Sequence, residues 1–421
     1  MKLVNRRVTY RMYPSPTEES RLEAARLLHQ RLYNACLEQR QMAYRNSGKG
    51  LYFEQQCKEL TLLRASDSLY KSLDAQSAQC TLRRLDLAFA NFFDRCAEGL
   101  PGGYPRFKSQ DRFKGFSFSQ TGWKFIPGIK LSKRGTAKHG QLKLSGIGII
   151  QVRGVPRNIG TYKTCTITKR AGQWYASLVM DCAPVRACGT KVGAGDLGLE
   201  TFLTMVFGED GELPLEVPNP RIVKKALKKQ EYLDKELHRK VMGSEGRKRA
   251  KEERQRFFAK QKNQRANFLH QISAALISLL ALFATEELNV AGMTSAGGPR
   301  KAGLNRELLS AAFATFLGLL QTKAEEAGVV WIWVPTKTVK PSQTCHLCGR
   351  QEKKLLSQRE HVCLCGANCG RDVNAARVML QWALKSLEEP VQLAEGLESS
   401  PAGFQGGGAG IRETTTIVAS T

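Results

Sequence analysis

The pattern of polar and apolar residues predicts a strand and then several helices in the first hundred positions. Residues 3–12 alternate as a β-strand does. Ser15-Pro16-Thr17-Glu18 has the capping serine, the proline at the first helical position and the glutamate three residues after the cap that mark a helix start. A helical pattern with polar faces continues to about Cys96, interrupted near residues 46–50. The last of these helices has an apolar stripe, which we expect to face a core: Leu87, Ala88, Ala90, Phe92 and Phe93.

The pattern changes after Gly99. Residues 102–108 are rich in glycine and proline and predict a link, after which short β-type runs separated by turns predict a small β-barrel that the first strand joins. From about Lys191 strands alternate with long helices, which predicts a second, α/β region. The segment from 388 is rich in Gly, Ser and Thr and is predicted to be disordered.

No segment of the sequence predicts membrane insertion or secretion. The first fourteen residues are polar, and the longest apolar run, Ile272 to Ala284, is too short to cross a bilayer and continues a charged helix. Seven cysteines are scattered as they are in proteins of reducing compartments. We therefore expect a soluble protein of the prokaryotic cytoplasm or nucleoid.

The charge of the chain gives the first indication of function. The formal net charge is +26, and residues 221–265 hold 17 Lys+Arg against 6 Asp+Glu in a helical pattern with a break at Gly243 and Gly246. Such an excess indicates a polyanionic partner, and nucleic acid is the obvious one. A solvated helix face or a structural RNA-binding protein fits the charge alone equally well. The candidate phosphate contacts in this segment are Lys224, Lys225, Lys228, Arg247 and Arg249.

Three acidic residues stand where chemistry is expected. Asp196 ends an apolar strand, Glu286 ends another, and Asp372 opens a helix that runs to about Lys385. Taken singly, Asp196 is explained by a turn and Asp372 by a helix cap. Together, and with residues 209–212 as a D-G hairpin turn, their order suits an RNase H-like core whose carboxylates bind two Mg²⁺ ions.

A cluster of cysteines predicts one structural Zn²⁺ site. Cys345 and Cys348 form a C-x-x-C pair, and fifteen residues later Cys363 and Cys365 form a contracted C-x-C pair. Cys369 is the alternative fourth ligand. Five unliganded thiols so close together would be prone to oxidation, which favours the metal site.

The chain resembles the TnpB family of transposon-encoded nucleases, which are related to compact type V CRISPR effectors. The resemblance covers nearly the whole chain and rests on the segments RMYPSPTEE, YNACLEQR, GGYPRFKS, GDLG, TEELNV, SQTCHLCG and RDVNAA. It implies that Asp196, Glu286 and Asp372 are the catalytic carboxylates, with Glu286 preferred to Glu287 because leucine follows the family's glutamate by two. It also implies a guide RNA from the flanking locus and a double-stranded DNA target. We add Tyr104, Arg106 and Lys108 as candidate nucleic-acid contacts.

The resemblance further implies a multidomain α+β fold: a wedge β-barrel with an inserted helical recognition domain, then a RuvC-like domain of RNase H fold with a zinc-ribbon insertion. The expected ranges are 1–12 and 100–188 for the barrel, 13–99 for the recognition domain, 189–338 and 371–387 for the RuvC-like domain, 339–370 for the zinc-ribbon target-nucleic-acid-binding segment and 388–421 for the disordered tail.

The expected function is RNA-guided, Mg²⁺-dependent cleavage of both DNA strands at one site beside a short recognition motif. Two alternatives remain: a non-cleaving RNA-guided DNA-binding repressor, which would be expected to lack a catalytic carboxylate, and a transposase proper. The sequence leaves open whether the locus is a transposon or a CRISPR array, and whether the protein is a monomer or a dimer on its RNA.

Overall fold

The computed structural model divides the chain into two compact units, Met1–Ala183 with Glu413–Thr421, and Pro184–Arg412. We describe each unit by itself. The structure describes residues 4–130, 137–156, 160–183, 186–208, 212–289, 292, 294, 298–355, 358–394 and 416–418.

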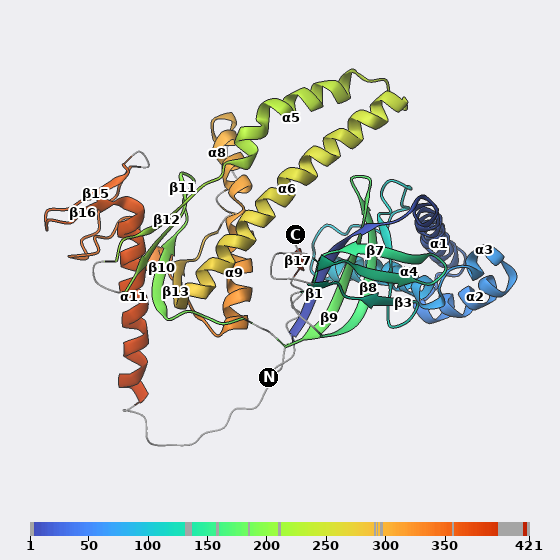
Figure 1. The fold of residues 1–421 in the computed structure, drawn as a ribbon, viewed down its shortest axis with the longest axis horizontal. Helices are drawn as coiled ribbons and strands as arrows, with labels where there is room; N and C mark the ends of the chain where they lie inside the picture. Colours follow the sequence, from blue (N-terminus) through green and yellow to red (C-terminus); the bar gives the residue numbers. More distant parts are fainter. Residues whose placement is uncertain are drawn as a thin grey trace. The chain divides into compact units, whose positions relative to one another are not determined.

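The first unit contains a barrel-like antiparallel sheet with the strand order β2-β8-β9-β1-β7-β6-β3. β1 (Val4–Tyr13) pairs with β9 along residues 4–11 and with β7 at residues 11–13, which confirms that the first strand inserts into the barrel (Figure 1). The short C-terminal strand β17 pairs with β1 in parallel. The other strands are β2 (Gly115–Phe118), β3 (Trp123–Ile126), β4 (Ile129–Lys130), β5 (Ala137–Lys138), β6 (Gly140–Leu144), β7 (Gly148–Arg153), β8 (Gly160–Arg170), β9 (Gln173–Cys182) and β17 (Thr416–Val418).

Helices α1 (Pro16–Ser47), α2 (Phe53–Ser66), α3 (Ser68–Lys71) and α4 (Ala75–Ala97) lie between β1 and β2 in the sequence. The predicted start of α1 is confirmed, because the Ser15 amide donates to Glu18 Oε2 at 2.7 Å while the Glu18 amide donates to Ser15 Oγ. The apolar stripe predicted for α4 is wrong in part. The buried positions of α4 end at Leu85, whereas Leu87 and Phe93 are more than half exposed.

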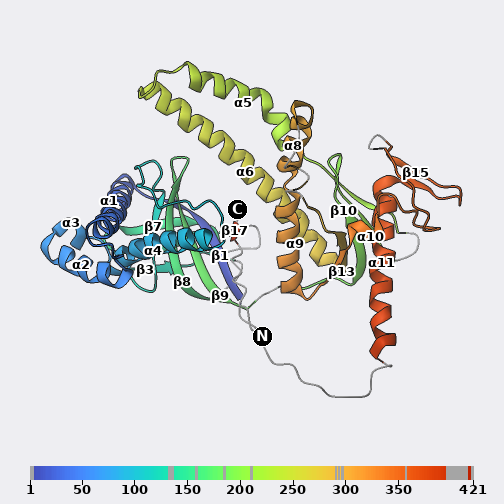
Figure 2. The same ribbon diagram turned by 180° about the vertical axis from the view of Figure 1, so that it is seen from behind.

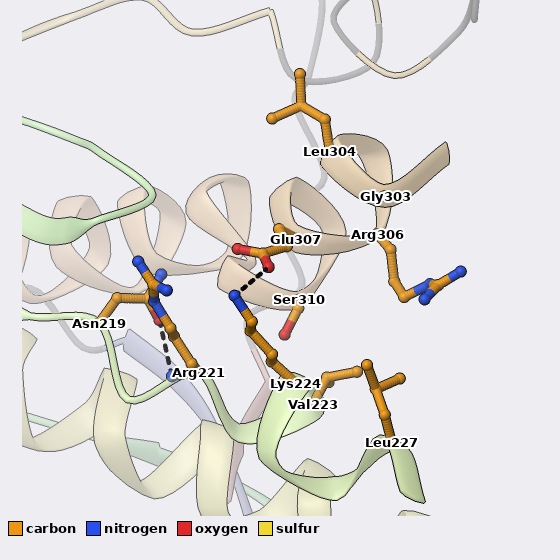
Figure 3. Close-up of a pocket in the computed structure, with 10 residues that line it drawn as sticks. All are labelled: Asn219, Arg221, Val223, Lys224, Leu227, Gly303, Leu304, Arg306, Glu307 and Ser310. Atoms are coloured by element: carbon orange, nitrogen blue, oxygen red, sulfur yellow. Dashed lines mark hydrogen bonds and ion pairs between the residues drawn. The ribbon is translucent and has the colours of Figure 1, made fainter. Parts of the chain in front are cut away.

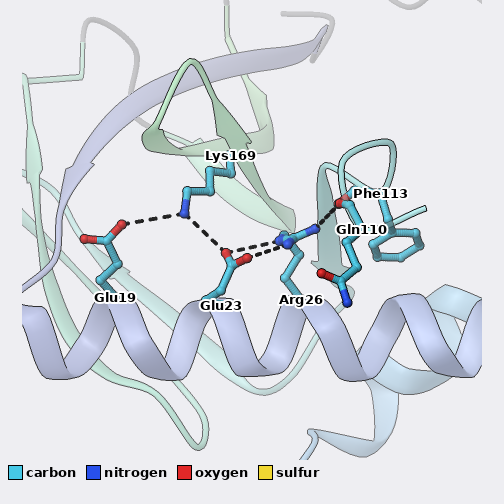
Figure 4. A network of polar contacts seen from close by, with 6 residues as sticks. All are labelled: Glu19, Glu23, Arg26, Gln110, Phe113 and Lys169. Carbon is cyan, nitrogen blue, oxygen red and sulfur yellow. Dashed lines mark hydrogen bonds and ion pairs between the residues drawn. The ribbon is translucent and has the colours of Figure 1, made fainter. Parts of the chain in front are cut away.

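A polar network attaches α1 to the barrel (Figure 4). Arg26 is buried and donates to the carbonyl oxygens of Gln110 at 2.6 Å and Phe113 at 2.7 Å. Glu23 accepts from Arg26 and from Lys169 of β8. The hydrogen bond from Arg26 lowers the pKa of Glu23 against the effect of burial. One buried guanidinium therefore joins the helix to the segment that leads into β2.

The second unit contains a five-stranded mixed sheet with the order β12-β11-β10-β13-β14. β10 (Lys191–Asp196), β11 (Thr201–Phe207) and β12 (Leu215–Pro218) form an antiparallel meander, and the predicted D-G turn at 209–211 lies outside the described residues. β13 (Leu280–Glu286) is parallel to β10, and β14 (Val330–Val334) is parallel to β13. Parallel neighbours require crossovers, which helices supply here.

Helices cover both faces of this sheet (Figures 1 and 2). One apolar cluster joins the sheet to α6 (Glu245–Leu279), α8 (Pro299–Ala311) and α9 (Phe313–Ala327), and a second joins it to α11 (Arg371–Ala394). Within β13, Phe283 belongs to the first cluster, while Leu282 and Ala284 belong to the second. Because this strand is buried on both faces, the apolar run 272–284 is the end of a helix followed by a strand, and not one long helix.

α5 (Ile222–Arg239) and α6 form the long basic hairpin that the charge pattern predicted (Figure 1). The chain turns at residues 240–244, where Gly243 has a φ of 83°. Gly246 lies inside the first turn of α6, so the predicted break includes only the first glycine. Ser244 caps α6 by accepting from the Arg247 amide at 3.2 Å.

The remaining elements of the second unit are α10 (Thr336–Val339) and the hairpin of β15 (Glu360–Val362) and β16 (Asn368–Gly370). α11 extends to Ala394, so its last seven residues lie within the range expected to be a disordered tail, and most of that tail lies outside the described residues. Among the helices that the structure describes, none is both long and apolar enough to cross a membrane.

Candidate active site and metal centre

The sheet of the second unit brings Asp196 and Glu286 to one edge. β10 and β13 are parallel with Ala194 opposite Ala284, so the acids two residues further on leave the sheet at neighbouring positions. The Thr285 hydroxyl donates to the Gly195 carbonyl at 2.9 Å and is buried. Because the carboxyl ends of parallel strands lie at the same edge of a sheet, the two strand-end acids come together without a special loop.

Asp372 reaches the same edge from α11. It lies in the first turn of the helix, whose apolar face packs on β10, β11, β13 and β14. A side chain built at Gly198 would place its Cβ 3.6 Å from Asp372 Oδ2 and 2.7 Å from the Thr201 carbonyl oxygen. The glycine of the GDLG segment therefore allows the chain to pass close to the Thr201 carbonyl in the loop after Asp196, and Asp372 lies within ordinary contact distance of this loop.

The electrostatics show that the three acids share one environment. Burial and the charges of Glu286 and Asp372 raise the pKa of Asp196 well above its ordinary value, against the opposing charge of Arg371. Burial also raises the pKa of Glu286, although a hydrogen bond with Thr336 opposes this. Like charges held together resist ionising unless a cation compensates them. Three such carboxylates form a donor set of hard oxygens, which divalent cations prefer.

Four thiols form the second candidate centre. The structure brings four cysteines together: Cys345, Cys348, Cys363 and Cys365. Their sulfur atoms all lie within 4.8 Å of one another, and no other group of three or more ligand-type side chains among the described residues is this compact, the three carboxylates included. The Sγ atoms of Cys345 and Cys365, and those of Cys348 and Cys363, are 3.6 Å apart. A tetrahedral ion with metal–sulfur bonds of about 2.3 Å needs sulfur atoms roughly 3.8 Å apart. The cluster therefore has the geometry to hold a metal ion.

Two tight turns present these thiols. The Gly349 amide donates to the Cys345 carbonyl and the Gly366 amide to the Cys363 carbonyl, both at 3.0 Å, and both glycines have positive φ. The second turn places Cys363 and Cys365 on one side despite their close spacing. Cys369 lies instead in β16, opposite His361 of β15, and is outside the four-thiol group. The structure thus brings together the four cysteines expected as ligands. The fourth of them is Cys365, and Cys369, the alternative fourth ligand, lies outside the group.

The basic hairpin exposes most of its candidate phosphate contacts. Lys224, Lys225, Lys228 and Arg249 are exposed, and Lys224 pairs with Glu307 of α8 at 3.7 Å beside a pocket at the start of α5 (Figure 3). Arg247 differs, because its Nη1 donates to the carbonyl oxygens of Leu237 and Lys240 and so closes the turn between the helices. The prediction of a phosphate contact at Arg247 now depends on its remaining nitrogens.

The link at 101–108 in the first unit is held in place by its neighbours. Tyr104 is 44% exposed and packs edge-on against Phe89 and Phe92 of α4. Arg106 is exposed, and the backbone of Lys108 exchanges hydrogen bonds with the side chain of Asn34 of α1. Their side chains are therefore presented from an ordered segment, as a contact surface requires.

Sequence reasoning missed the residues that join the cysteine cluster to α11. Asn374 is fully buried and bonds to Thr344 and His346, the residues on either side of Cys345. The available signal was the asparagine two residues after Asp372 in RDVNAA, which helix propensity does not explain.

Two family models match separate parts of the chain, and together these parts contain the three carboxylates and the four thiols. Residues 178–296 match the family model described as "Probable transposase" (OrfB_IS605), and residues 313–379 match the model "Cas12f1-like, TNB domain". The first range contains Asp196 and Glu286, and the second contains the four thiols and Asp372.

Curated relatives cover most of the chain. A protein of Streptomyces pristinaespiralis named "Putative RNA-guided DNA endonuclease" is 28% identical over 90% of each chain. A protein of Escherichia coli (strain K12) named "Putative RNA-guided DNA endonuclease InsQ" is 29% identical over 79% of this chain and 80% of its own. Among solved structures, Cas12f1 in a complex with sgRNA and target DNA has a TM-score of 0.48 at 13% identity, covering 90% of this chain and 99% of that one.

Proposed function

We propose that this chain, which is TnpB-like, is an RNA-guided DNA endonuclease that hydrolyses phosphodiester bonds at a site formed by Asp196, Glu286 and Asp372. The observation that carries the proposal is the convergence of the three carboxylates at one sheet edge, where Glu286 and Asp372 raise the pKa of Asp196. A half-buried group of like charges is costly to the fold and is expected where a cation site needs it.

The strand order supports a RuvC-like core of RNase H fold. Such a core has a three-stranded antiparallel meander beside two parallel strands, with the first strand central. The order β12-β11-β10-β13-β14 has this form, and helices cover both of its faces. The acid of the central strand, the acid of its parallel neighbour and the acid of the last helix are then the ones that meet.

The donor set fits two Mg²⁺ ions, which Asp196, Glu286 and Asp372 would hold. When bound, such ions supply Lewis acidity that activates water and stabilises the leaving oxygen. The chain itself fixes the three carboxylates on two strands and the first turn of a helix. Thr336 lowers the pKa of Glu286 against the effect of burial and so favours its charged form, and the Thr336 hydroxyl donates to the Glu287 carbonyl at 3.4 Å.

We assign the four thiols to a structural Zn²⁺ in a zinc-ribbon-like segment. The thiols interact with one another: hydrogen bonds from backbone amides and from His361 lower the pKa of Cys345 although burial opposes them, while the neighbouring thiols raise the pKa of Cys365. The assignment therefore rests on the spacing of the four sulfur atoms. The exposed lysines of α5 and Arg249 of α6 are assigned to the backbone of guide RNA or of the RNA–DNA heteroduplex. Tyr104, Arg106 and Lys108 are assigned to a further nucleic-acid contact.

The experiment uses the protein purified from cells that also express its native flanking DNA. A discrete co-purifying RNA with a variable end identifies the guide, and a matching DNA target is then tested for Mg²⁺-dependent cleavage by wild type and by E286Q. The matched control is E287Q, which removes an exposed carboxylate at the adjacent position. We expect E286Q to bind RNA and target but to cleave more than about 100-fold more slowly, while E287Q cleaves normally. Equal cleavage by wild type and E286Q would reject the assignment.

A further inference from the structure

α11 has two faces with different partners. Val373, Ala376, Met379, Leu380 and Ala383 are buried in the apolar cluster on the sheet. Arg371, Asn374 and Arg377 are spaced by three and share the other face. Each of these three side chains bonds to the segment 344–358 that holds or adjoins Cys345 and Cys348. The helix that carries Asp372 is therefore also the helix to which the segment of the cysteine cluster is hydrogen-bonded.

Asn374 makes the central contact. Its Oδ1 accepts from the His346 amide at 3.1 Å and from His346 Nδ1 at 2.9 Å, and its Nδ2 donates to the Thr344 carbonyl at 2.7 Å. Thr344 and His346 flank Cys345. The buried side-chain amide of Asn374 therefore hydrogen-bonds to the backbone on both sides of a candidate zinc ligand. These bonds use both acceptor positions of Oδ1 and one of the two Nδ2 hydrogens.

Arg377 and Arg371 complete the attachment. The Arg377 guanidinium donates to His346 Nε2 at 3.2 Å, which agrees with His346 donating through its other ring nitrogen to Asn374. Arg371 Nη1 donates to the Leu355 carbonyl at 2.9 Å, and the Arg371 amide donates to the Arg359 carbonyl at 2.8 Å. These bonds fix the first two turns of α11, and Asp372 lies within the first turn.

We propose that Asn374 is a positioning residue that couples occupation of the cysteine cluster to the position of Asp372, so that metal binding at the four thiols strengthens divalent-cation binding at the three carboxylates. The proposal rests on the proposed function of both centres. An empty cluster leaves four thiols free to move, and the backbone at Thr344 and His346 moves with them. Asn374 then loses its partners, and the first turn of α11 loses the contacts that hold it beside Asp196.

Reciprocity makes the coupling measurable without catalysis. If a metal at the thiols raises cation affinity at the acids by some factor, cations at the acids must raise thiol-site affinity by the same factor. Mn²⁺ reports on the acids by electron paramagnetic resonance, and Co²⁺ reports on the thiols by its visible absorption. In the purified protein–RNA complex we expect loading of the thiol site to tighten Mn²⁺ binding by about 10-fold.

The variant that tests the role of Asn374 is N374A, with Q381A at an exposed position of the same helix as its control. We expect N374A to weaken Co²⁺ binding by roughly 10- to 100-fold, as loss of a supporting hydrogen bond does in metal sites. With the thiol site saturated, we also expect N374A to weaken Mn²⁺ binding and to raise the Mg²⁺ concentration for half-maximal cleavage about 10-fold. Guide RNA binding is expected to be unchanged.

Two outcomes overturn the proposal. One is normal Mn²⁺ affinity in N374A despite weakened Co²⁺ binding, which would confine Asn374 to the cysteine cluster. The other is Mn²⁺ affinity in wild type that does not depend on loading of the thiols. If N374A does not fold, N374D keeps an acceptor oxygen for His346 but replaces the donor to the Thr344 carbonyl with a second oxygen, and is also expected to weaken both Co²⁺ and Mn²⁺ binding. Failure of wild type to cleave any guided target, with the Mn²⁺–Co²⁺ coupling intact, would reject the nuclease function and leave the coupling standing.

Discussion

The hydroxyl of Thr285 donates a hydrogen bond of 2.9 Å to the carbonyl of Gly195, and the next residue in each strand is an acid. This bond between the parallel strands β10 and β13 fixes the starting points of Asp196 and Glu286. Their proximity is therefore a property of the sheet, and Asp372 joins them only because α11 packs across the same strands.

The acid site should destabilise the cation-free protein at neutral pH. The pKa of Asp196 is raised in the folded chain, so the folded state binds more protons than the unfolded state between the two pKa values, and stability falls as pH rises through that window. We expect D196N to raise the Tm of the cation-free protein at pH 7 to 8. The gain should shrink near pH 4 and on addition of Mg²⁺.

The measurement is differential scanning calorimetry at several pH values, with E287Q as the surface-charge control. A Tm gain in D196N that is the same at pH 4 and pH 8 would contradict this electrostatic explanation.

Removing one thiol of the cluster should release the metal, and removing Cys369 should not. C348S leaves three ligands, whereas C369S changes a residue of β16 outside the four-thiol group. We expect C369S to retain one equivalent of zinc and C348S to bind it at least about 100-fold more weakly. Elemental analysis and competition with a chromogenic chelator measure both. Loss of zinc in C369S with retention in C365S would make Cys369 the fourth ligand.

The exposed lysines of α5 should contribute to affinity through charge. Each phosphate contact adds about one unit to the slope of log affinity against log salt. We therefore expect K225Q/K228Q to reduce the salt slope of guide RNA or target binding by up to about 2. K225R/K228R keeps the charge and is the matched control. Filter binding over a range of salt concentrations measures the slope, and an unchanged slope in the Gln variant would remove these lysines from the interface.

Arg26 should stabilise the first unit. R26L leaves the carbonyl oxygens of Gln110 and Phe113 without their donor and Glu23 without its closest partner. We expect a loss of about 2–3 kcal/mol in the free energy of unfolding of this unit. R31A removes an exposed arginine of the same helix and should cost less than about 0.5 kcal/mol. Chemical denaturation of the full chain, followed by a signal from Trp174, compares the two.

Local patterns were sufficient to predict several elements. Alternation identified β1, the S-P-T-E segment identified the start of α1, and the charge run identified the α5–α6 hairpin. They failed where burial depends on distant partners. The apolar stripe predicted at the end of α4 is exposed at Leu87 and Phe93, beyond Leu85, the last buried position of the helix.

The residues available for chemistry can be read from the amino-acid sequence: three carboxylates at the ends of predicted elements, a C-x-x-C and a C-x-C pair, and a cationic hairpin. These signals are local, because a helix cap, a turn or a pair of metal ligands is recognised from residues only a few positions apart. The folded chain adds that Asp196, Glu286 and Asp372 share one environment, that Cys365 and not Cys369 faces Cys345, and that Asn374 bonds to Thr344 beside Cys345. These relationships depend on parallel strand pairing and on helix packing between segments as many as 176 positions apart, from Asp196 to Asp372, and no local pattern encodes such contacts.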